Sequence, residues 1–151
     1  MTDIVNPEMI HLARRIAAAH GIEPALVCAV IEQESDWDPW AVRYEPGFLA
    51  RYVAPLYTAG KFSATEAYTR SMSWGLMQVM GQVARESGFK QSSLAELCDA
   101  ATGLEFGCRV LAKRLARSKG DVRAALLAWN GGANDRYPTQ VLARKCNYSS
   151  K

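Results

Sequence analysis

The residue best placed for acid–base chemistry is Glu34. In a helix, Glu34 falls on the same face as Val27, Val30 and Ile31. Three polar residues fall on the opposite face, which we expect to meet water: Glu32, Gln33 and Asp36. Loss of hydration raises the pKa of a carboxyl group, and the negative C-terminal end of the helix dipole acts in the same direction. A raised pKa suits a general acid that works near neutral pH. The pattern leaves two alternatives open for Glu34: an ion pair with a buried arginine, or a side chain that leaves the apolar face at the helix end.

Two further segments combine apolar and polar side chains. Residues 73–80 (Ser-Trp-Gly-Leu-Met-Gln-Val-Met) place a glycine, which permits close backbone approach, beside Gln78, which carries both a donor and an acceptor. Residues 124–132 contain Trp129-Asn130-Gly131, where an aromatic ring beside an amide forms a candidate stacking platform. These groups suit a sugar ring and its acetamido group. The structural alternatives are core packing for the first segment and a simple helix stop for the second.

Helical periodicity dominates the chain that must position these groups. The predicted helices cover about residues 7–20, 24–36, 100–118 and 121–130, with a last helix from about residue 138. Ser-x-x-Glu sequences at residues 63–66 and 93–96 predict two further helix starts of the capping-box type. Extended structure is predicted only at residues 43–49 and 75–80. We therefore expect a mainly α domain of about six to eight helices, with a long loop region at about residues 37–62.

Length and composition describe a single globular domain over residues 1–151. The chain is 49% hydrophobic and 22% charged with a formal net charge of +3, which excludes a disordered protein. Because the basic excess is small, we expect no nucleic-acid partner. The longest apolar run, Ala25 to Ile31, is far shorter than the roughly 20 residues of a membrane span, so we expect no membrane insertion.

The N-terminal sequence and the cysteines bear on cellular context. The first 20 residues carry Asp3, Glu8, Arg14 and Arg15 and lack the apolar core of a signal peptide. We therefore expect synthesis in the cytoplasm without a Sec signal, and free thiols at all four cysteines. No Cys-x-x-Cys spacing is present, so we expect no zinc site or other metal, and no motif indicates a cofactor.

Three of these segments, in this order, resemble the motifs of one enzyme family. Glu34-Ser35, Gly75-Leu76-Met77-Gln78 and Trp129-Asn130-Gly131 are similar to the Glu-Ser, Gly-Leu-Met-Gln and Ala-Tyr-Asn-Ala-Gly motifs of the soluble-lytic-transglycosylase (SLT) domain, a relative of goose-type lysozyme. The resemblance covers about residues 20–145. It implies a lysozyme-like α fold, peptidoglycan glycan strands as the partner, and Glu34 as the only essential acid and base.

The resemblance also implies which residues line the substrate groove. Gln78 and Met80 match the Gln-x-Met of the family's groove. Trp129 replaces the family's usual Tyr beside Asn130, and Tyr137 matches a late Tyr that precedes the final helix.

The chain also departs from the family pattern. About 40 residues separate Glu34 from Gly75, far more than in the family. The groove serine that family members carry soon after Glu-Ser has no clear counterpart, and Ser73 is only a neighbour of that role. Ala133 and Asn134 stand where some members have an acidic residue. These departures leave the fine substrate contacts open.

Two reactions are compatible with the pattern. In a lytic transglycosylase, Glu34 would protonate the β-1,4 bond between N-acetylmuramic acid and N-acetylglucosamine and then deprotonate the C6 hydroxyl, which leaves 1,6-anhydro-muramic acid ends. In a hydrolytic muramidase (a lysozyme or endolysin), a second carboxylate would position water, roughly 6.5–9.5 Å from the acid in inverting enzymes. Glu45 and Glu66 are the candidates, although a loop position explains Glu45 and a capping box explains Glu66.

A non-catalytic interpretation also stays open. Arg109, Lys113, Arg114, Arg117 and Lys119 form a basic stretch that suits a solvated helix face or an anionic polymer. The chain would then be a cell-wall-binding or phage structural module. We expect a monomer. For a cell-wall enzyme without a signal peptide we expect action after release or export, through phage or prophage lysis, a virion or a secretion machine.

Overall fold

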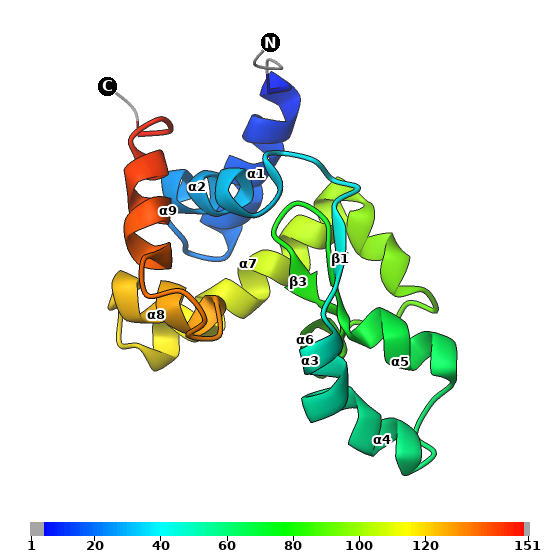
Figure 1. The fold of residues 1–151 in the computed structure, drawn as a ribbon. Coiled ribbons are helices and arrows are strands. Elements are labelled where there is room, and N and C mark those ends of the chain that lie inside the picture. Colours follow the sequence, from blue (N-terminus) through cyan, green and yellow to red (C-terminus); the bar gives the residue numbers. More distant parts are fainter. Residues whose placement is uncertain (1–4, 150–151) are drawn as a thin grey trace.

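Helix α2 (Pro24–Ser35) is the centre of the fold. The computed structural model describes residues 5–149, which are mainly helical, as predicted. Proline at the first position of α2 suits a helix start, and every residue from Ala25 to Ile31 is buried. Helices α1 (Pro7–Ala19) and α9 (Tyr137–Lys145) pack against α2 (Figure 1). The helix ends because Asp36 adopts a left-handed conformation with φ of 51°.

The face of α2 that we expected to meet water is instead covered by the C-terminal part of the chain. Glu32 accepts hydrogen bonds from Arg144 Nη1 and from the Tyr148 hydroxyl, both at 2.6 Å. Gln33 Oε1 accepts another from Arg144 Nε at 2.8 Å, and of the three polar residues only Asp36 is exposed. The prediction was wrong because periodicity within one helix does not show which polar side chains a later segment binds.

A small antiparallel sheet forms the second half of the fold. Its strands are β1 (Val42–Tyr44), β2 (Met72–Trp74) and β3 (Val79–Met80), in the order β1-β2-β3. The strands are shorter than the extended segments that we expected. Residues 46–48 are helical, and residues 75–78 form the turn between β2 and β3.

Residues 37–62 hold more regular structure than the predicted long loop. After β1 the chain forms α3 (Pro46–Phe48), the π-helical turn η1 (Leu49–Val53) and α4 (Ala54–Thr58), one directly after another. Helix α5 (Ala64–Arg70) follows. The prediction of a loop was wrong because Val53 is the only buried residue of 46–58, so no apolar periodicity indicates the helical run.

Helix α7 (Ala100–Arg117) joins the two halves of the molecule (Figure 1). Helix α6 (Gly81–Glu86) and the 3-10 helix η2 (Leu94–Cys98), which begins at the predicted capping serine Ser93, lie on the side of the sheet. Helix α8 (Val122–Trp129) packs against α7 and α9 on the side of α2. This arrangement places the end of α2 opposite the sheet.

The cysteines are free thiols, as predicted. Cys28, Cys98 and Cys108 are buried, and Cys146 is exposed. Burial raises the pKa of Cys28 to about 11 and that of Cys108 to about 12, so both remain protonated at neutral pH. Over residues 5–149, no helix has both the length and the apolar character to cross a membrane.

Gly75 fixes the turn between β2 and β3 against the rest of the fold. Its φ of 71° is left-handed, and a Cβ atom at this position would lie 2.5 Å from the carbonyl oxygen of Leu97. Its amide donates to the carbonyl oxygen of Ala41 at 2.8 Å. The turn therefore requires a residue without a side chain, both for its conformation and for its contact with η2.

We expect Gly75→Ala to cost about 3 kcal/mol or more in the free energy of unfolding, because the new methyl group meets backbone that cannot rotate away. Gly60→Ala is the matched control, since Gly60 has a similar φ of 73° but open space where a Cβ atom would lie. It should cost about 1 kcal/mol. Urea unfolding of both variants measures the difference, and equal costs would show that the contact with Leu97 is unimportant.

Candidate active site

The carboxyl group of Glu34 lies at the end of α2 among aromatic side chains. Its Oε1 accepts a hydrogen bond from the indole Nε1 of Trp129 at 3.2 Å and another from the Tyr137 hydroxyl at 2.5 Å. Trp129 ends α8 and Tyr137 begins α9. Both residues were predicted to bind substrate, and in the structure their polar hydrogens point to the predicted acid.

Burial raises the pKa of Glu34 above its usual value. The hydrogen bonds from Tyr137 and Trp129 and the positive charge of Arg43 favour the ionised form, but they offset only part of this effect. Within the described residues no arginine or lysine forms an ion pair with Glu34. The alternative that Glu34 pairs with a buried arginine is therefore wrong. Tyr137 stays protonated, because burial and the nearby Glu34 carboxylate raise its pKa.

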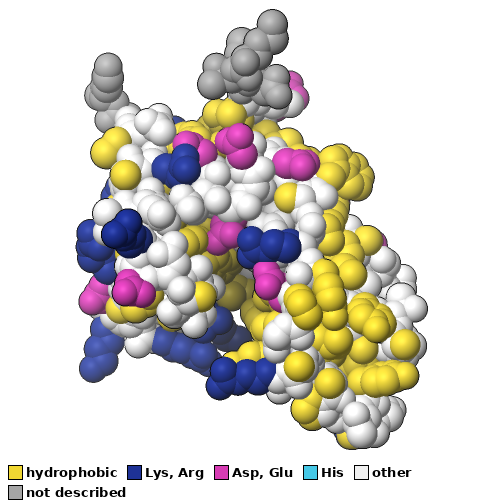
Figure 2. All heavy atoms as spheres, in the orientation of Figure 1, with side chains coloured by type: hydrophobic (Ala, Val, Ile, Leu, Met, Phe, Trp, Pro, Cys, Tyr) yellow, Lys and Arg dark blue, Asp and Glu magenta, His cyan; other side chains and the backbone are white. Residues whose placement is uncertain are grey.

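A cavity of about 770 Å³ opens between the two halves of the molecule in front of Glu34. Figure 2 shows the hollow between the half that contains α8 and the half that contains α3 and α4, with basic side chains at its lower edge. The cavity brings together most of the predicted site residues: Glu34, Glu45, Ser73, Gln78, Met80, Trp129 and Asn130. Tyr137 is buried behind Glu34 and is not part of the lining.

Ser35, the residue after Glu34, connects the first motif to the second. Its hydroxyl lies 2.8 Å from the carbonyl oxygen of Leu76 and 3.2 Å from that of Ile31, and it can donate to either. Leu76 belongs to the turn between β2 and β3. The hydrogen bond to Leu76 therefore holds the end of α2 that carries Glu34 against the opposite wall of the cavity.

Gln78 and Ser73 shape this wall from within. Gln78 has a positive φ of 52°, and its Nε2 donates to the carbonyl oxygens of Ala41 and Gly75, both at 2.9 Å. Its Oε1 accepts from the Ser73 hydroxyl at 2.7 Å. Both amide hydrogens of Gln78 are therefore used inside the protein. Its side chain lines the cavity, but its main role is to hold the turn between β2 and β3 against Ala41, the residue before β1.

Met80 and Asn130 lie at the ends of elements on different sides of the cavity. Met80 is the last residue of β3 and is partly buried. Asn130 caps the C-terminus of α8, and its Nδ2 donates to the carbonyl oxygen of Asn134 at 3.4 Å. An apolar side chain and an amide thus face the space where a sugar would lie.

Of the two candidate second carboxylates, only Glu45 lines the cavity. Its Oε1 accepts a hydrogen bond from Arg43 Nε at 2.6 Å. Arg43 lines the same cavity and its charge lowers the pKa of Glu34. Glu45 is therefore already paired with the cation that faces the predicted acid.

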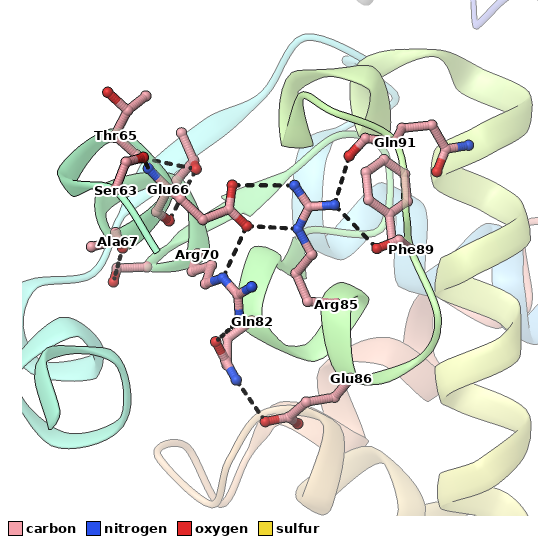
Figure 3. A network of polar contacts seen from close by, with 12 residues as sticks. Ser63, Thr65, Glu66, Ala67, Arg70, Gln82, Arg85, Glu86, Phe89 and Gln91 are labelled. Carbon is pink, nitrogen blue, oxygen red and sulfur yellow. Dashed lines mark hydrogen bonds and ion pairs between the residues drawn. The ribbon is translucent and has the colours of Figure 1, made fainter. Parts of the chain in front are cut away.

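Glu66 lies outside the cavity lining and belongs to a network of charged groups between α5 and α6 (Figure 3). Arg85 donates two hydrogen bonds to its carboxylate, at 2.7 and 3.1 Å, and Arg70 donates one at 2.9 Å. The predicted cap at Ser63 is present, because its Oγ accepts from the Glu66 amide at 3.2 Å. The Glu66 side chain turns to the arginines instead of completing a capping box.

Sequence reasoning missed several residues of the cavity. Arg43, Phe48, Arg51 and Tyr52 come from the region predicted as a loop, and Arg114 comes from the basic stretch of α7. The unusual number of aromatic residues in 40–57 was the available signal. Over residues 5–149, no group of three or more His, Cys, Asp or Glu side chains is arranged to hold a metal ion.

A mainly helical, lysozyme-like fold with a partly buried carboxyl group in a cleft is typical of enzymes that act on polysaccharides. The model of the transglycosylase SLT domain family matches residues 11–145, and the chain belongs to this family. It is therefore an enzyme, a peptidoglycan lytic transglycosylase. No curated protein and no solved structure matches the chain.

The network around Glu66 predicts a loss of stability at acid pH. Burial alone would raise the pKa of Glu66, but the hydrogen bonds and charges of Arg85 and Arg70 outweigh it and leave the pKa below its usual value. The ionised form therefore stabilises the fold above the unfolded-state pKa, and this contribution is lost as pH falls through the folded-state pKa.

We expect Glu66→Gln to lower the free energy of unfolding at neutral pH by about 2 kcal/mol or more, and by less in acid. The control is Glu23→Gln, which removes the exposed pair with Lys145 and should cost less than about 1 kcal/mol. Denaturant unfolding at several pH values measures both. A cost of Glu66→Gln that does not shrink in acid would contradict this account.

The hydrogen bond from Tyr137 to Glu34 predicts how the pKa of Glu34 changes when the hydroxyl group is removed. Tyr137→Phe removes a hydrogen bond that favours the ionised carboxylate, so the pKa of Glu34 should rise further above its usual value. Carbon-13 NMR titration of the Glu34 carboxyl group measures this without any substrate. An unchanged or lower pKa in the variant would show that the hydroxyl does not stabilise the charge.

Proposed function

We propose that Glu34 acts first as the general acid and then as the general base in cleavage of the peptidoglycan glycan strand. The observation that carries the proposal is that Glu34, at the cavity between the two halves, is the one carboxyl group among residues 5–149 whose pKa is raised. A carboxyl group of this kind keeps its proton at a pH where exposed carboxylates have lost theirs. It can donate that proton to a glycosidic oxygen.

In the first step, Glu34 gives its proton to the β-1,4 oxygen between N-acetylmuramic acid and N-acetylglucosamine, and the bond from this oxygen to C1 breaks. The acetamido oxygen of the muramic acid attacks C1 and carries the positive charge in a cyclic intermediate. In the second step, ionised Glu34 takes the proton of the C6 hydroxyl. The C6 oxygen then attacks C1 and the acetamido oxygen leaves. The product is a 1,6-anhydro ring, Glu34 is again protonated, and no water is consumed.

Trp129 and Tyr137 support both steps through the pKa of Glu34. Their hydrogen bonds stabilise the carboxylate that forms after the first proton transfer, while burial keeps the carboxyl group protonated before it. We assign Met80 and Asn130 to contacts with the sugar, because both line the cavity. Gln78 is a positioning residue, since both of its amide hydrogens bind backbone carbonyls.

The pairing of Glu45 and Glu66, the two candidate second carboxylates, supports a reaction in which neither of them activates water. Glu45 is bound to Arg43, and Glu66 is held by two arginines outside the cavity. Glu86 also lines the cavity, and its Oε1 accepts a hydrogen bond from Gln82 Nε2 at 2.8 Å. A hydrolytic mechanism needs a free carboxylate that activates water. The family match also favours the lyase reaction.

Glu34→Gln tests the proposed acid directly. We expect release of soluble muropeptides from purified peptidoglycan to fall by about 10³-fold or more, because the amide cannot transfer the proton. Glu32→Gln is the matched control on the same helix, since Glu32 binds Arg144 and Tyr148 away from the cavity. Activity of Glu34→Gln comparable with that of Glu32→Gln would refute the assignment.

Stability separates a catalytic defect from misfolding in the same variant. Because the folded-state pKa of Glu34 is raised, wild-type stability falls as pH rises through that pKa. The amide carries no charge, so Glu34→Gln should unfold at an equal or higher temperature than wild type at neutral pH. A large drop in Tm would mean that lost activity reports unfolding.

Glu45→Gln tests the hydrolytic alternative. The lyase mechanism predicts that this variant keeps the same product type as wild type, whatever its rate, because Glu45 handles no proton in either step. If Glu45 activates water, the variant should lose activity about as severely as Glu34→Gln. Chromatographic comparison of the products from both variants decides between the two.

A further inference from the structure

The helical run α3–η1–α4 forms an outer wall of the cavity that contains Glu34. Phe48, Arg51 and Tyr52 from this run line the same continuous space as Glu34 and Trp129. Figure 2 shows hydrophobic side chains gathered over this part of the molecule. The run lies within the insertion between the first two motifs, so the motifs themselves do not account for it.

The aromatic side chains of this wall are not needed for the core. As far as residues 5–149 describe the core, neither Phe48 nor Tyr52 belongs to it or packs against it. The Tyr52 side chain is 49% exposed. Large aromatic residues left open to solvent beside a cavity are typical of binding surfaces.

The wall also has a defined geometry. The rings of Phe48 and Tyr52 lie 4.9 Å apart at an angle of 49°, and the Arg51 guanidinium lies 5.1 Å from the Tyr52 ring. Arg51 and Tyr52 belong to the π-helical turn η1, and Phe48 directly precedes it. Such turns are rare and frequently occur at functional sites, because the additional residue redirects the neighbouring side chains.

We propose that Phe48, Arg51 and Tyr52 form an additional subsite that binds sugar units of the same glycan strand beyond the bond that is cleaved. The proposal rests on the proposed function, since it assigns the cavity to a glycan strand. The apolar face of a pyranose ring packs against an aromatic ring. The guanidinium of Arg51 forms no ion pair within the described residues, and it can bind the lactyl carboxylate of a muramic acid unit.

The consequence is a preference for long strands. We expect a tetrasaccharide bound across Glu34 to cover the wall of α3 and η1 only in part, whereas a longer strand covers it fully. Added contacts at the wall increase affinity for the long strand alone. The insertion thereby sets the number of sugar units that the enzyme binds on one side of the cleaved bond.

Binding measurements in the Glu34→Gln background test this subsite without turnover. The probes are peptide-free peptidoglycan glycans, one a purified tetrasaccharide and the other a fraction of long strands. We expect Tyr52→Ala to raise the Kd for long strands roughly tenfold and to leave the Kd for the tetrasaccharide unchanged. Tyr52→Phe keeps the ring and should retain the preference for long strands.

Tyr57→Ala is the matched control. Tyr57 lies in α4 of the same insertion and is 47% exposed, but it does not line the cavity. Its removal should change neither Kd. Equal effects of Tyr52→Ala and Tyr57→Ala, or equal effects of Tyr52→Ala on both glycans, would overturn the subsite.

The subsite and the proposed function can fail separately. If Glu34→Gln cleaves peptidoglycan like wild type, the proposed acid is wrong whatever the binding results. If Glu34→Gln is inactive but binds the tetrasaccharide and the long strands with equal affinity, the acid stands and the subsite is refuted.

Discussion

The burial of one carboxyl group, that of Glu34, constrains much of the structure. The Glu34 side chain is largely shielded from water although it lines the cavity, because α2 is central and its residues 25–31 are all buried. Glu34 must also be able to ionise, so its carboxylate needs hydrogen-bond donors. Trp129 at the end of α8 and Tyr137 at the start of α9 supply them. Three helices thus converge on a single group whose two protonation states are both accessible.

The opposite wall of the cavity, which includes the turn between β2 and β3, is held in place mainly through backbone groups. Ser35 can donate to the carbonyl oxygen of Leu76, Gln78 donates to that of Ala41, and Gly75 lies directly against Leu97. Because side chains of the insertion take no part in these contacts, the segment from α3 to α4 can vary without displacing the wall. It is therefore free to carry residues that contact the substrate.

Helices with regular apolar periodicity could be predicted, and α1, α2 and α7 begin and end within about two residues of the expected bounds. The same periodicity placed Glu34 on the apolar face. It could not show the donors Trp129 and Tyr137, which lie 95 and 103 residues away along the chain. The helical run after β1 was missed because it buries almost nothing. Ser63 caps α5 as the pattern predicts, but the carboxylate of Glu66 binds Arg85, which lies on another helix.

The measurement that tests the central claim most directly is mass spectrometry of muropeptides released in water enriched in heavy oxygen. If Glu34 performs both proton transfers, wild-type products end in 1,6-anhydro-muramic acid, are lighter than hydrolysis products by one water and contain no heavy oxygen. Reducing muramic acid ends that carry heavy oxygen would show attack by water and contradict the account. Unlabelled anhydro products formed at an undiminished rate by Glu34→Gln would contradict the assignment of the acid.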